Sequence, residues 1–288
     1  MNNNTGIILE GGAMRSIFTA GILDFYLDKN IDIPNVLAVS AGGYAAMNYV
    51  SGQKGRILDS VVTPMETMKV HGVSTFFRTG NYFDMDLLFD KIPKGGDCPF
   101  DFDAFINSGK HYITSTINLL TGEAVYFDQF KDIDEFLKIT RVANSLPFLA
   151  KVGYIDGIPM MDGGMADAIP IAKALQEGWE KIIVVLTRDS KYRKKPGGDT
   201  YDHWWANLIY RKYPGLLKAI ARRPGVYNGA IEKINELEKE GRVFVYRPPA
   251  GVTLVNHLKE TSILRDYYQA GYKVAEEKYD ELMAFLNA

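Results

Sequence analysis

A buried strand that ends on a serine flanked by small residues constrains this chain more than any other feature. Residues 36–39 (Val-Leu-Ala-Val) are apolar and include two β-branched residues, which is typical of a short buried strand. Ser40 follows directly, and three small residues (41–43) lead into residues 44–50, whose composition favours a helix. A serine on a sharp turn between a buried strand and a helix is the pattern of a nucleophile elbow. The alternative is that Ser40 only caps the helix, as serines commonly do.

A glycine-containing loop precedes the elbow and follows another short strand. Residues 6–9 are apolar, and residues 17–27 have the apolar content of a well-buried helix. The loop between them, residues 10–16 (Glu-Gly-Gly-Ala-Met-Arg-Ser), matches neither the dinucleotide-binding nor the phosphate-loop signature. Free backbone N–H groups at such a strand-to-helix turn suit an anion. The loop is therefore either a tight connection or an oxyanion hole, in which Gly11 and Gly12 allow close approach of the backbone.

The order of the elements predicts the fold class. Strand, loop, helix, strand, elbow and helix follow one another within residues 6–50, an alternation typical of a parallel sheet covered by helices. A further buried strand is expected at 181–187, and an adjoining pair of strands at 112–118 and 124–127. We therefore predict an α/β protein. Helices are also expected at 132–142, 230–239 and 264–286.

Three aspartates lie in one glycine-rich stretch, and the pattern around each indicates a different role. Asp156-Gly157 between apolar flanks is a strong signal for a two-residue hairpin turn. Asp162 ends the second strand of that hairpin, and the two glycines after it allow its carboxylate to approach another element. Asp167 lies before residues 168–175 and is expected to cap their helix. Asp162 is thus the aspartate of the three that fits neither the turn nor the cap.

An activated serine needs a base, and the chain offers two kinds. In a triad the base is a histidine, and His203 and His257 follow Asp162 in the order serine, acid, histidine. None of the four histidines in the chain lies in the usual tight-turn setting. In a dyad, Asp162 contacts Ser40 directly. Because a carboxylate is a weak base, the surroundings of Asp162 must then raise its pKa or desolvate it.

Size and composition fit one large α/β domain over residues 1–288 and exclude several function classes. The chain has 288 residues, 47% of them apolar, which is enough for a substantial core. A net charge of −2 implies no bulk attraction to nucleic acid. The single cysteine, Cys98, excludes an internal disulfide and a cysteine-cluster metal site, and fits a reducing compartment. Without a signal peptide or an apolar run long enough to span a bilayer, we expect a cytoplasmic protein.

One segment departs from this near-neutral balance. Residues 188–223 carry ten basic against three acidic residues, a local net charge of +7, with tryptophan and tyrosine interleaved. Basic and aromatic residues together suit the interface of an anionic membrane. The alternative is a solvated loop with a few buried aromatic side chains. The segment therefore predicts, at most, a peripheral contact with the inner face of a membrane.

Three motifs together resemble those of the patatin-like phospholipases, most closely the bacterial branch. Residues 10–15, the elbow at Ser40 and the run Asp162-Gly163-Gly164 occur in the family's order and approximate spacing. The resemblance covers most of residues 5–190 and, more loosely, the C-terminal third. It implies a three-layer α/β/α sandwich with a mainly parallel sheet, and hydrolysis of phospholipid or related acyl esters.

The resemblance also implies roles for individual residues. Ser40 would be the nucleophile and Asp162 its partner in a dyad. The oxyanion hole would be formed by Gly11, Gly12, Ala13 and Arg15. The catalytic motifs would lie within 5–190, with 191–288 packing as a helical and strand extension of the same domain. Neither a metal nor an organic cofactor is implied, and no oligomeric state is predicted.

The chain departs from the family pattern at small residues. The family loop usually has glycine where this chain has Ala13 and Ser16, and the elbow usually has glycine where it has Ala38. A Cβ at a position that needs positive φ costs about 1–2 kcal/mol. A lipid- or acyl-binding protein of the same fold without catalysis therefore stays open. The histidines leave open a second alternative, a triad esterase acting on small soluble esters. The aromatic residues between 71 and 105 either line an acyl pocket or cover the core.

Overall fold

The computed structural model describes residues 4–68, 70–195, 204–249 and 261–288. The strands are β1 (Thr5–Leu9), β2 (Asn35–Val39), β3 (His111–Asn118), β4 (Ala124–Phe127), β5 (Gly153–Ile155), β6 (Ile158–Asp162), β7 (Lys181–Val185) and β8 (Val243–Tyr246). The helices are α1 (Ser16–Asp28), α2 (Ala41–Val50), α3 (Thr63–Thr67), α4 (Val73–Thr79), α5 (Ile92–Gly95), α6 (Phe102–Ile106), α7 (Ile133–Ala143), α8 (Ile171–Gln176), α9 (Trp204–Ile209), α10 (Pro214–Lys239), α11 (Thr261–Glu277) and α12 (Tyr279–Asn287). Short 3₁₀ or π turns are η1 (Ala13–Arg15), η2 (Leu58–Val62), η3 (Leu87–Lys91) and η4 (Gly163–Met165).

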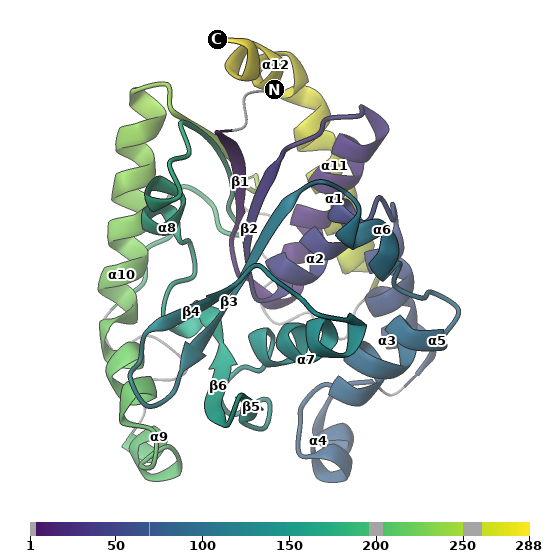
Figure 1. The fold of residues 1–288 in the computed structure, drawn as a ribbon, viewed down its shortest axis with the longest axis vertical. Coiled ribbons are helices and arrows are strands. Elements are labelled where there is room, and N and C mark those ends of the chain that lie inside the picture. The colour runs from purple at the N-terminus through teal and green to yellow at the C-terminus, as the bar shows by residue number, and fades with distance from the viewer. Residues whose placement is uncertain (1–3, 69, 196–203, 250–260) are drawn as a thin grey trace.

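The described strands form one mixed sheet in the middle of the protein (Figure 1). Its strand order is β5-β6-β3-β2-β1-β7-β8, and β4 pairs with β3. The pairs β1–β2, β1–β7, β2–β3 and β7–β8 are parallel, whereas the pairs that involve β4, β5 and β6 are antiparallel. The predicted α/β class with a mainly parallel sheet is therefore confirmed.

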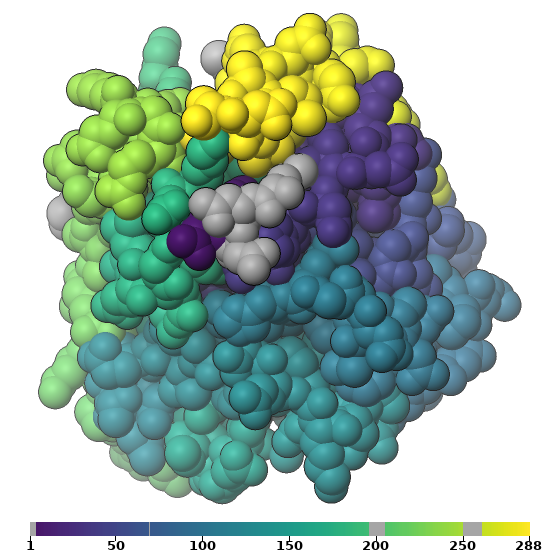
Figure 2. Space-filling model, turned by 45° about the horizontal axis from the view of Figure 1, so that its top comes forward, coloured from purple at the N-terminus to yellow at the C-terminus, as the bar shows by residue number. Residues whose placement is uncertain are grey.

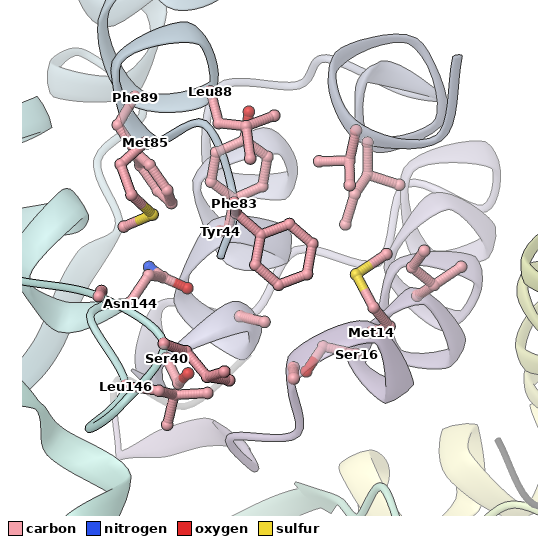
Figure 3. A pocket seen from close by; sticks show the side chains of 17 residues that line it. Met14, Ser16, Ser40, Tyr44, Phe83, Met85, Leu88, Phe89, Asn144 and Leu146 are labelled. Atoms are coloured by element: carbon pink, nitrogen blue, oxygen red, sulfur yellow. The ribbon is translucent and has the colours of Figure 1, made fainter. Parts of the chain in front are cut away.

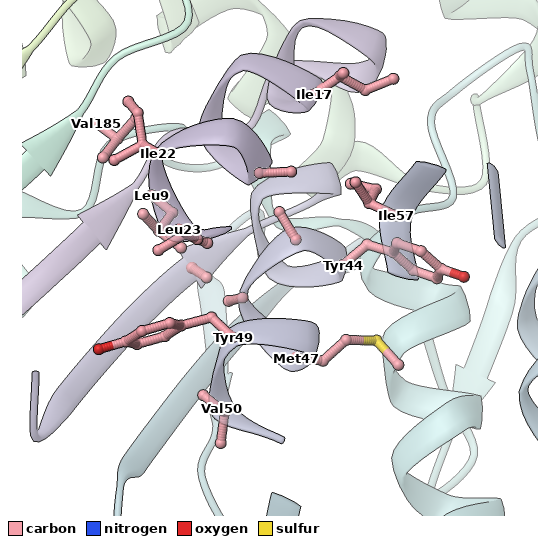
Figure 4. Packing of buried hydrophobic residues seen from close by; sticks show 14 of the residues in the cluster. Leu9, Ile17, Ile22, Leu23, Tyr44, Met47, Tyr49, Val50, Ile57 and Val185 are labelled. Carbon is pink, nitrogen blue, oxygen red and sulfur yellow. The ribbon is translucent and has the colours of Figure 1, made fainter. Parts of the chain in front are cut away.

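Helices cover both faces of the sheet because its central strands are apolar on both sides. Ile7 and Leu9 of β1 pack into one cluster with α1, α2 and α11, while Ile8 packs into a second cluster with α8 and α10. The same alternation holds along β7, where Ile183 and Ile182 face opposite clusters. Continuous apolar strands of this kind are typical of parallel sheets buried between helices. Figure 4 shows side chains of α1 and α2 meeting Leu9 and Val185 from the sheet. The result is the three-layer sandwich.

The antiparallel part of the sheet includes the predicted hairpin. Asp156 and Gly157 join β5 to β6 with φ of 51° and 76°, the left-handed conformations that a type I′ turn needs. In β6, Asp162 lies opposite Thr116 of β3. The prediction of a turn at Asp156-Gly157 is confirmed. The paired strands expected at 112–118 and 124–127 are also confirmed, as β3 and β4.

The C-terminal helices pack on the first helix of the chain. A Cβ built on Gly21 of α1 would lie 2.0 Å from the carbonyl oxygen of Tyr268, and one on Gly271 of α11 would lie 2.0 Å from that of Phe18. The two backbones therefore touch where only glycine fits on either helix. Phe25 also makes edge-on ring contacts with Tyr272 and Tyr279. Figure 2 shows the yellow C-terminal helices beside the purple N-terminal part of the chain.

Three expectations about helices are wrong in detail. The helix expected at 230–239 begins at Pro214 and contains Pro224, a residue that usually ends a helix because it lacks an N–H. The closing helix expected at 264–286 is two helices that meet at Lys278. Asp167 does not cap α8, which begins at Ile171. Its carboxylate instead accepts from the N–H of Ile169 at 3.0 Å, a local turn that competes with the cap.

Candidate active site

Ser40 lies on a strained turn between β2 and α2. Its φ and ψ are 55° and −131°, a conformation that residues with a Cβ rarely adopt and that costs on the order of 1–3 kcal/mol. The side chain is 5% exposed. Two residues later, a Cβ on Gly42 would lie 2.8 Å from the carbonyl oxygen of Leu9, so α2 can start this close to β1 only with glycine there. Ser40 therefore lies on a strained strand-to-helix turn, the local geometry that the predicted elbow requires.

Asp162 lies within hydrogen-bond distance of Ser40. Ser40 Oγ donates to Asp162 Oδ2 at 2.5 Å, and the N–H of Gly164 donates to Asp162 Oδ1 at 2.8 Å. The backbone N–H of Asp162 donates to the carbonyl oxygen of Ser145 at 2.9 Å, which fixes the end of β6. The carboxylate is therefore held on both oxygens, one of them by the serine. The structure brings together the two residues that the sequence analysis paired.

Burial changes the acidity of Asp162. The side chain is 1% exposed, and this desolvation raises its pKa to about 6. The hydrogen bonds from Ser40 and Gly164 and the charge of Arg223 act in the opposite direction, because each favours the ionised form. Arg223 reaches this position from α10, where its Nε donates to the carbonyl oxygen of Gly164 at 3.0 Å. Asp162 is therefore ionised at neutral pH but is more basic than an exposed aspartate.

Amide groups of the glycine-containing loop lie beside Ser40. The N–H of Gly11 donates to the carbonyl oxygen of Ala168 at 3.3 Å, so it is already used within the fold. By contrast, the N–H groups of Gly12, Ala13 and Ala41 donate to no acceptor in the described part of the chain. Gly12, Ala13 and Ser40 line the same cavity. An anion beside the serine would meet these unused donors.

Ala13 holds the conformation that the sequence analysis identified as costly. Its φ is +49°, in the left-handed region that favours glycine. Ser16, the other departure from the family loop, is an ordinary helical residue with φ of −69° and needs no glycine. Only Ala13 therefore carries backbone strain from a replaced loop glycine.

A buried carboxylate lies beneath the loop. Glu10 is 2% exposed, and its side chain accepts from the N–H of Thr187 and from the Tyr227 hydroxyl. Burial raises the pKa of Glu10, and the charge of Arg15 lowers it. The pKa of Arg15 is lowered by burial and by the like charge of Arg188, against the opposing charge of Glu10. Glu10 and Arg15 thus stabilise each other's charge where the loop meets β7.

Two cavities meet at Ser40. The smaller, of about 100 Å³, is apolar, and its walls come from α1, α2, the η2 and η3 region and the segment after α7. Figure 3 shows Ser40 and Leu146 at one end of it, with Met14, Phe83 and Met85 further along. The larger, of about 510 Å³, contains Asp162 and is lined on its other side by basic residues of 188–195 and α10. Ala13, Ser40, Leu146 and Leu149 line both.

The aromatic residues between 71 and 105 divide between the two expected roles. Phe83 and Phe89 line the apolar cavity. Phe100 and Phe105 are buried in the core, where Phe100 stacks on Phe136 of α7 at 5.2 Å between ring centroids. The sequence could not separate these roles, because the segment has no regular period that tells one face from the other.

Neither histidine that the structure describes lines a cavity at Ser40. His111 begins β3, at the end of the sheet opposite the elbow, and contacts Asp128 at 3.1 Å. His71 pairs with Phe83 through a backbone bridge and lines neither cavity. His203 and His257, the triad candidates, lie outside the described residues. Among the described residues, no group of three or more histidine, cysteine, aspartate or glutamate side chains is placed to hold a metal ion.

Sequence reasoning missed two residues at the site. The sequence indicates Arg223 only as one of the basic residues of 188–223, although it contacts the Asp162–Gly164 turn. Its neighbour Pro224 argues against a helix there, and without the helix nothing places Arg223 near β6. The second is Ala41, whose N–H follows the serine. The elbow pattern itself could have indicated this donor, because the residue after the nucleophile commonly supplies one.

The site residues fall within the range matched by a known family. The model described as "Patatin-like phospholipase" matches residues 7–175, more than half of the chain. The chain belongs to the patatin-like phospholipase family. This membership supports a hydrolase function on lipid esters. A second model, "Domain of unknown function (DUF6363)", matches residues 213–287.

Two known proteins are similar to this patatin-like chain. YjjU of Escherichia coli K12, described as uncharacterized, is 23% identical over 269 residues, which are 92% of this chain and 74% of that protein. The crystal structure of VipD from Legionella pneumophila aligns with a TM-score of 0.47 and 11% identity, over 96% of this chain and 67% of that one. In the described part of this patatin-like chain, no helix has both the length and the hydropathy to cross a bilayer.

Proposed function

We propose that this protein is a serine acyl-ester hydrolase that acts on phospholipids or related lipid esters, with Ser40 as nucleophile and Asp162 as base. The observation that carries the proposal is the direct hydrogen bond of 2.5 Å from Ser40 Oγ to Asp162 Oδ2. It joins a strained serine, open to two cavities, to a buried carboxylate. Family membership supports the ester chemistry.

The reaction would proceed through an acyl-serine. Ser40 Oγ attacks the acyl carbonyl carbon while Asp162 accepts the hydroxyl proton. The carbonyl oxygen gains negative charge beside the unused N–H groups of Gly12, Ala13 and Ala41. When the tetrahedral species collapses, the bond to the alcohol oxygen breaks and Asp162 returns its proton to that oxygen. Water then attacks the acyl-serine, with Asp162 again as base, and the fatty acid leaves.

The acidity of Asp162 fits this task. A general base works best with a pKa near the operating pH, and burial brings that of Asp162 to about 6. Because Asp162 Oδ2 accepts a hydrogen bond directly from Ser40 Oγ, no imidazole lies between the acid and the nucleophile. This arrangement favours the dyad over a triad completed by His203 or His257. Loss of turnover in His203→Ala or in His257→Ala, with Asp162→Asn unaffected, would select the triad instead.

Covalent labelling tests the nucleophile. A fluorophosphonate probe should label the purified protein on Ser40, and Ser40→Ala should lose labelling and hydrolysis of a short-chain nitrophenyl ester by roughly a thousandfold or more. Ser51→Ala is a matched control, because Ser51 lies at the far end of α2 and bonds only to nearby groups. Full esterase activity in Ser40→Ala would end the proposal. Vesicle binding without any labelling would favour the lipid-binding alternative, for which the strain at Ala13 is the supporting observation.

We also propose that the protein contacts membranes peripherally. Apolar side chains are exposed on two short helices: Val73 and Phe77 on α4, at 69% and 84%, and Leu208 and Ile209 on α9, at 62% and 57%. Figure 1 shows α4 and α9 at the same end of the molecule, on either side of the β5–β6 hairpin. The basic segment 188–223 contains α9, which adds attraction to anionic lipid.

A further inference from the structure

The larger of the two cavities at Ser40 is unusually rich in positive charge. Besides Asp162, the described residues that line its 510 Å³ include five cationic side chains and no other carboxylate. The five are Arg15, Arg188, Lys194, Lys195 and Arg223. The sequence supports this balance, because the whole segment 188–223 contains ten basic and only three acidic residues. A cleft lined by charges of one sign concentrates the field within it and attracts ligands of the opposite sign.

Contacts with neighbouring aromatic rings and amide groups hold the cationic groups in position. The guanidinium of Arg188 lies over the ring of Tyr192 at 4.4 Å, and the ammonium of Lys194 lies 5.2 Å from the ring of Tyr227. The backbone of Lys194 is fixed to α10 by two hydrogen bonds of 3.0 Å with the Asn228 side chain. Rings and amides thus hold these cations at the cavity.

Arg15 shows that the charges crowd one another. Its Nε is buried and has no hydrogen-bond partner among the described residues. The charge of Arg188 lowers the pKa of Arg15, as expected for two guanidinium groups that approach each other where water is scarce. Glu10 compensates only one of the two charges from below the loop. An anion with several acceptor oxygens in the cavity would relieve this repulsion.

The position of Ser40 fixes which part of an ester enters each cavity. The acyl chain needs apolar walls, which the smaller cavity provides with Met14, Phe83 and Leu88. The alcohol part must then leave the carbonyl carbon toward the cationic side. A choline or ethanolamine head there would place a positive charge among five others. A phosphate monoester carries a charge of about −1.5 to −2 at neutral pH and accepts paired hydrogen bonds from guanidinium groups.

We propose that the cationic cavity selects acyl esters whose alcohol bears a phosphate monoester, such as acylated glycerol phosphates. This inference rests on the proposed function for its orientation of the ester, and it assigns the polar product as a phosphorylated alcohol. The basic segment therefore recognises the substrate headgroup, in addition to any contact with a membrane surface.

Binding to a variant that cannot turn over tests the inference separately from catalysis. Ser40→Ala is titrated calorimetrically with 1-acyl-glycerol 3-phosphate and with its phosphocholine analogue, both with the same short chain and below the critical micelle concentration. The monoester should bind at least about tenfold more tightly, and added salt should narrow the difference. Equal affinities would overturn the inference. Glycerol 3-phosphate without a chain should bind more weakly than the acylated form, and equal binding would overturn the assignment to a lipid.

Charge variants tie the preference to the cavity. The next measurement uses protein that retains Ser40. The ratio of kcat/KM for the monoester to that for the phosphocholine ester should be about tenfold or more lower in Lys194→Gln/Lys195→Gln than in wild type. Arg211→Gln/Lys212→Gln removes two exposed charges of the same segment outside the cavity and should keep the ratio. A ratio unchanged by the first pair would overturn the inference. If hydrolysis depends on Ser40 but its rate is the same for both headgroups, only the inference is refuted. If the protein binds the monoester selectively but hydrolyses neither ester, only the proposed enzyme activity is refuted.

Discussion

Ser40 and Asp162 lie 122 positions apart in the chain, yet their side chains share a hydrogen bond of 2.5 Å at the ends of β2 and β6. The two strands do not pair with each other. Both pair with β3, β2 over His111–Ser115 and β6 over Thr116–Asn118. The bond therefore depends on one strand that continues past the end of β2.

Activity should fall as Asp162 becomes protonated. Because burial holds its pKa at about 6, the rate of fluorophosphonate labelling should rise with pH, with a midpoint near 6, and level off above neutrality. The measurement is the initial labelling rate of wild-type protein across this range. Asp162→Asn, which cannot titrate, should label slowly and without the step. A wild-type rate that stays flat well below pH 5 would contradict the role of Asp162 as base.

The same carboxylate should cost stability at neutral pH. Its folded-state pKa of about 6 exceeds the unfolded value of about 3.9, so the native state binds more protons between these limits and is favoured most at the acid end. The stability that the protonated Asp162 side chain contributes is lost as the pH rises through 6. Asp162→Asn should therefore raise the free energy of unfolding at neutral pH by roughly 1–3 kcal/mol, and by less near pH 4.5. Denaturant unfolding at the two pH values measures this, and an equal gain at both would contradict it.

Arg223 should tune the acidity of Asp162. Its positive charge lowers the pKa of that carboxyl, so Arg223→Gln should move the midpoint of the labelling profile to higher pH. Arg222→Gln is the matched control, because Arg222 bonds instead to Glu123 and to the Gly122 carbonyl oxygen. We expect a shift of a few tenths of a pH unit for Arg223→Gln and none for the control. A shift of the same size in both variants would indicate a general effect of net charge.

Replacement of Ala13 by glycine should not destabilise the protein. Its φ of +49° costs about 1–2 kcal/mol with a Cβ, while glycine adds about 0.5–1 kcal/mol of backbone entropy to the unfolded chain. Ala13→Gly should therefore leave stability equal or raise it by up to about 1 kcal/mol. Ala284→Gly, at an exposed site in the middle of α12, should lower stability by about 0.5–1 kcal/mol. Thermal unfolding of both variants measures the contrast, and equal losses would show that Ala13 is not strained.

Removal of an apolar side chain from α4 should weaken vesicle binding. Phe77 is 84% exposed, and burial of a phenylalanine side chain in lipid contributes about 1.5–3 kcal/mol. Phe77→Ser should lower the apparent affinity for anionic vesicles, measured by sedimentation, by about tenfold. Ile106→Ser, at a 48% exposed site on α6, should bind as wild type. Equal losses in both would place the contact elsewhere.

The sequence predicted the parts of the site that depend on local pattern. Residues 36–39 are apolar without interruption, so β2 and the serine that ends it could be recognised, and the glycines after Asp162 indicated a close approach. The likeness to patatin-like phospholipases then paired Ser40 with Asp162. Family membership is confirmed by the match over residues 7–175. The roles of the individual site residues stay predictions until labelling and mutagenesis test them.

What could not be predicted depends on contacts between distant elements. Arg223 lies near Asp162 only because α10 runs unbroken through Pro224, against the usual effect of proline. Arg223, Arg15 and Arg188 line the same cavity although they come from three separate segments of the chain. Similarly, the sequence could name Gly11 as an oxyanion residue but could not show that Ala168 already accepts its N–H. The periodicity of apolar residues describes one helix or strand at a time, so it carries no information on which distant residues come into contact.

The crossing of Gly21 with Gly271 has a consequence for the order in which the protein matures. The helix that follows the Gly11–Arg15 loop packs against α11, so it is fully covered only after the chain has been extended through Glu277. Until then α1 exposes Phe18 and Phe25, two side chains that are at most 1% exposed in the finished fold. A nascent chain should therefore keep its first βα unit open, and in need of chaperone protection, until α11 has been synthesised.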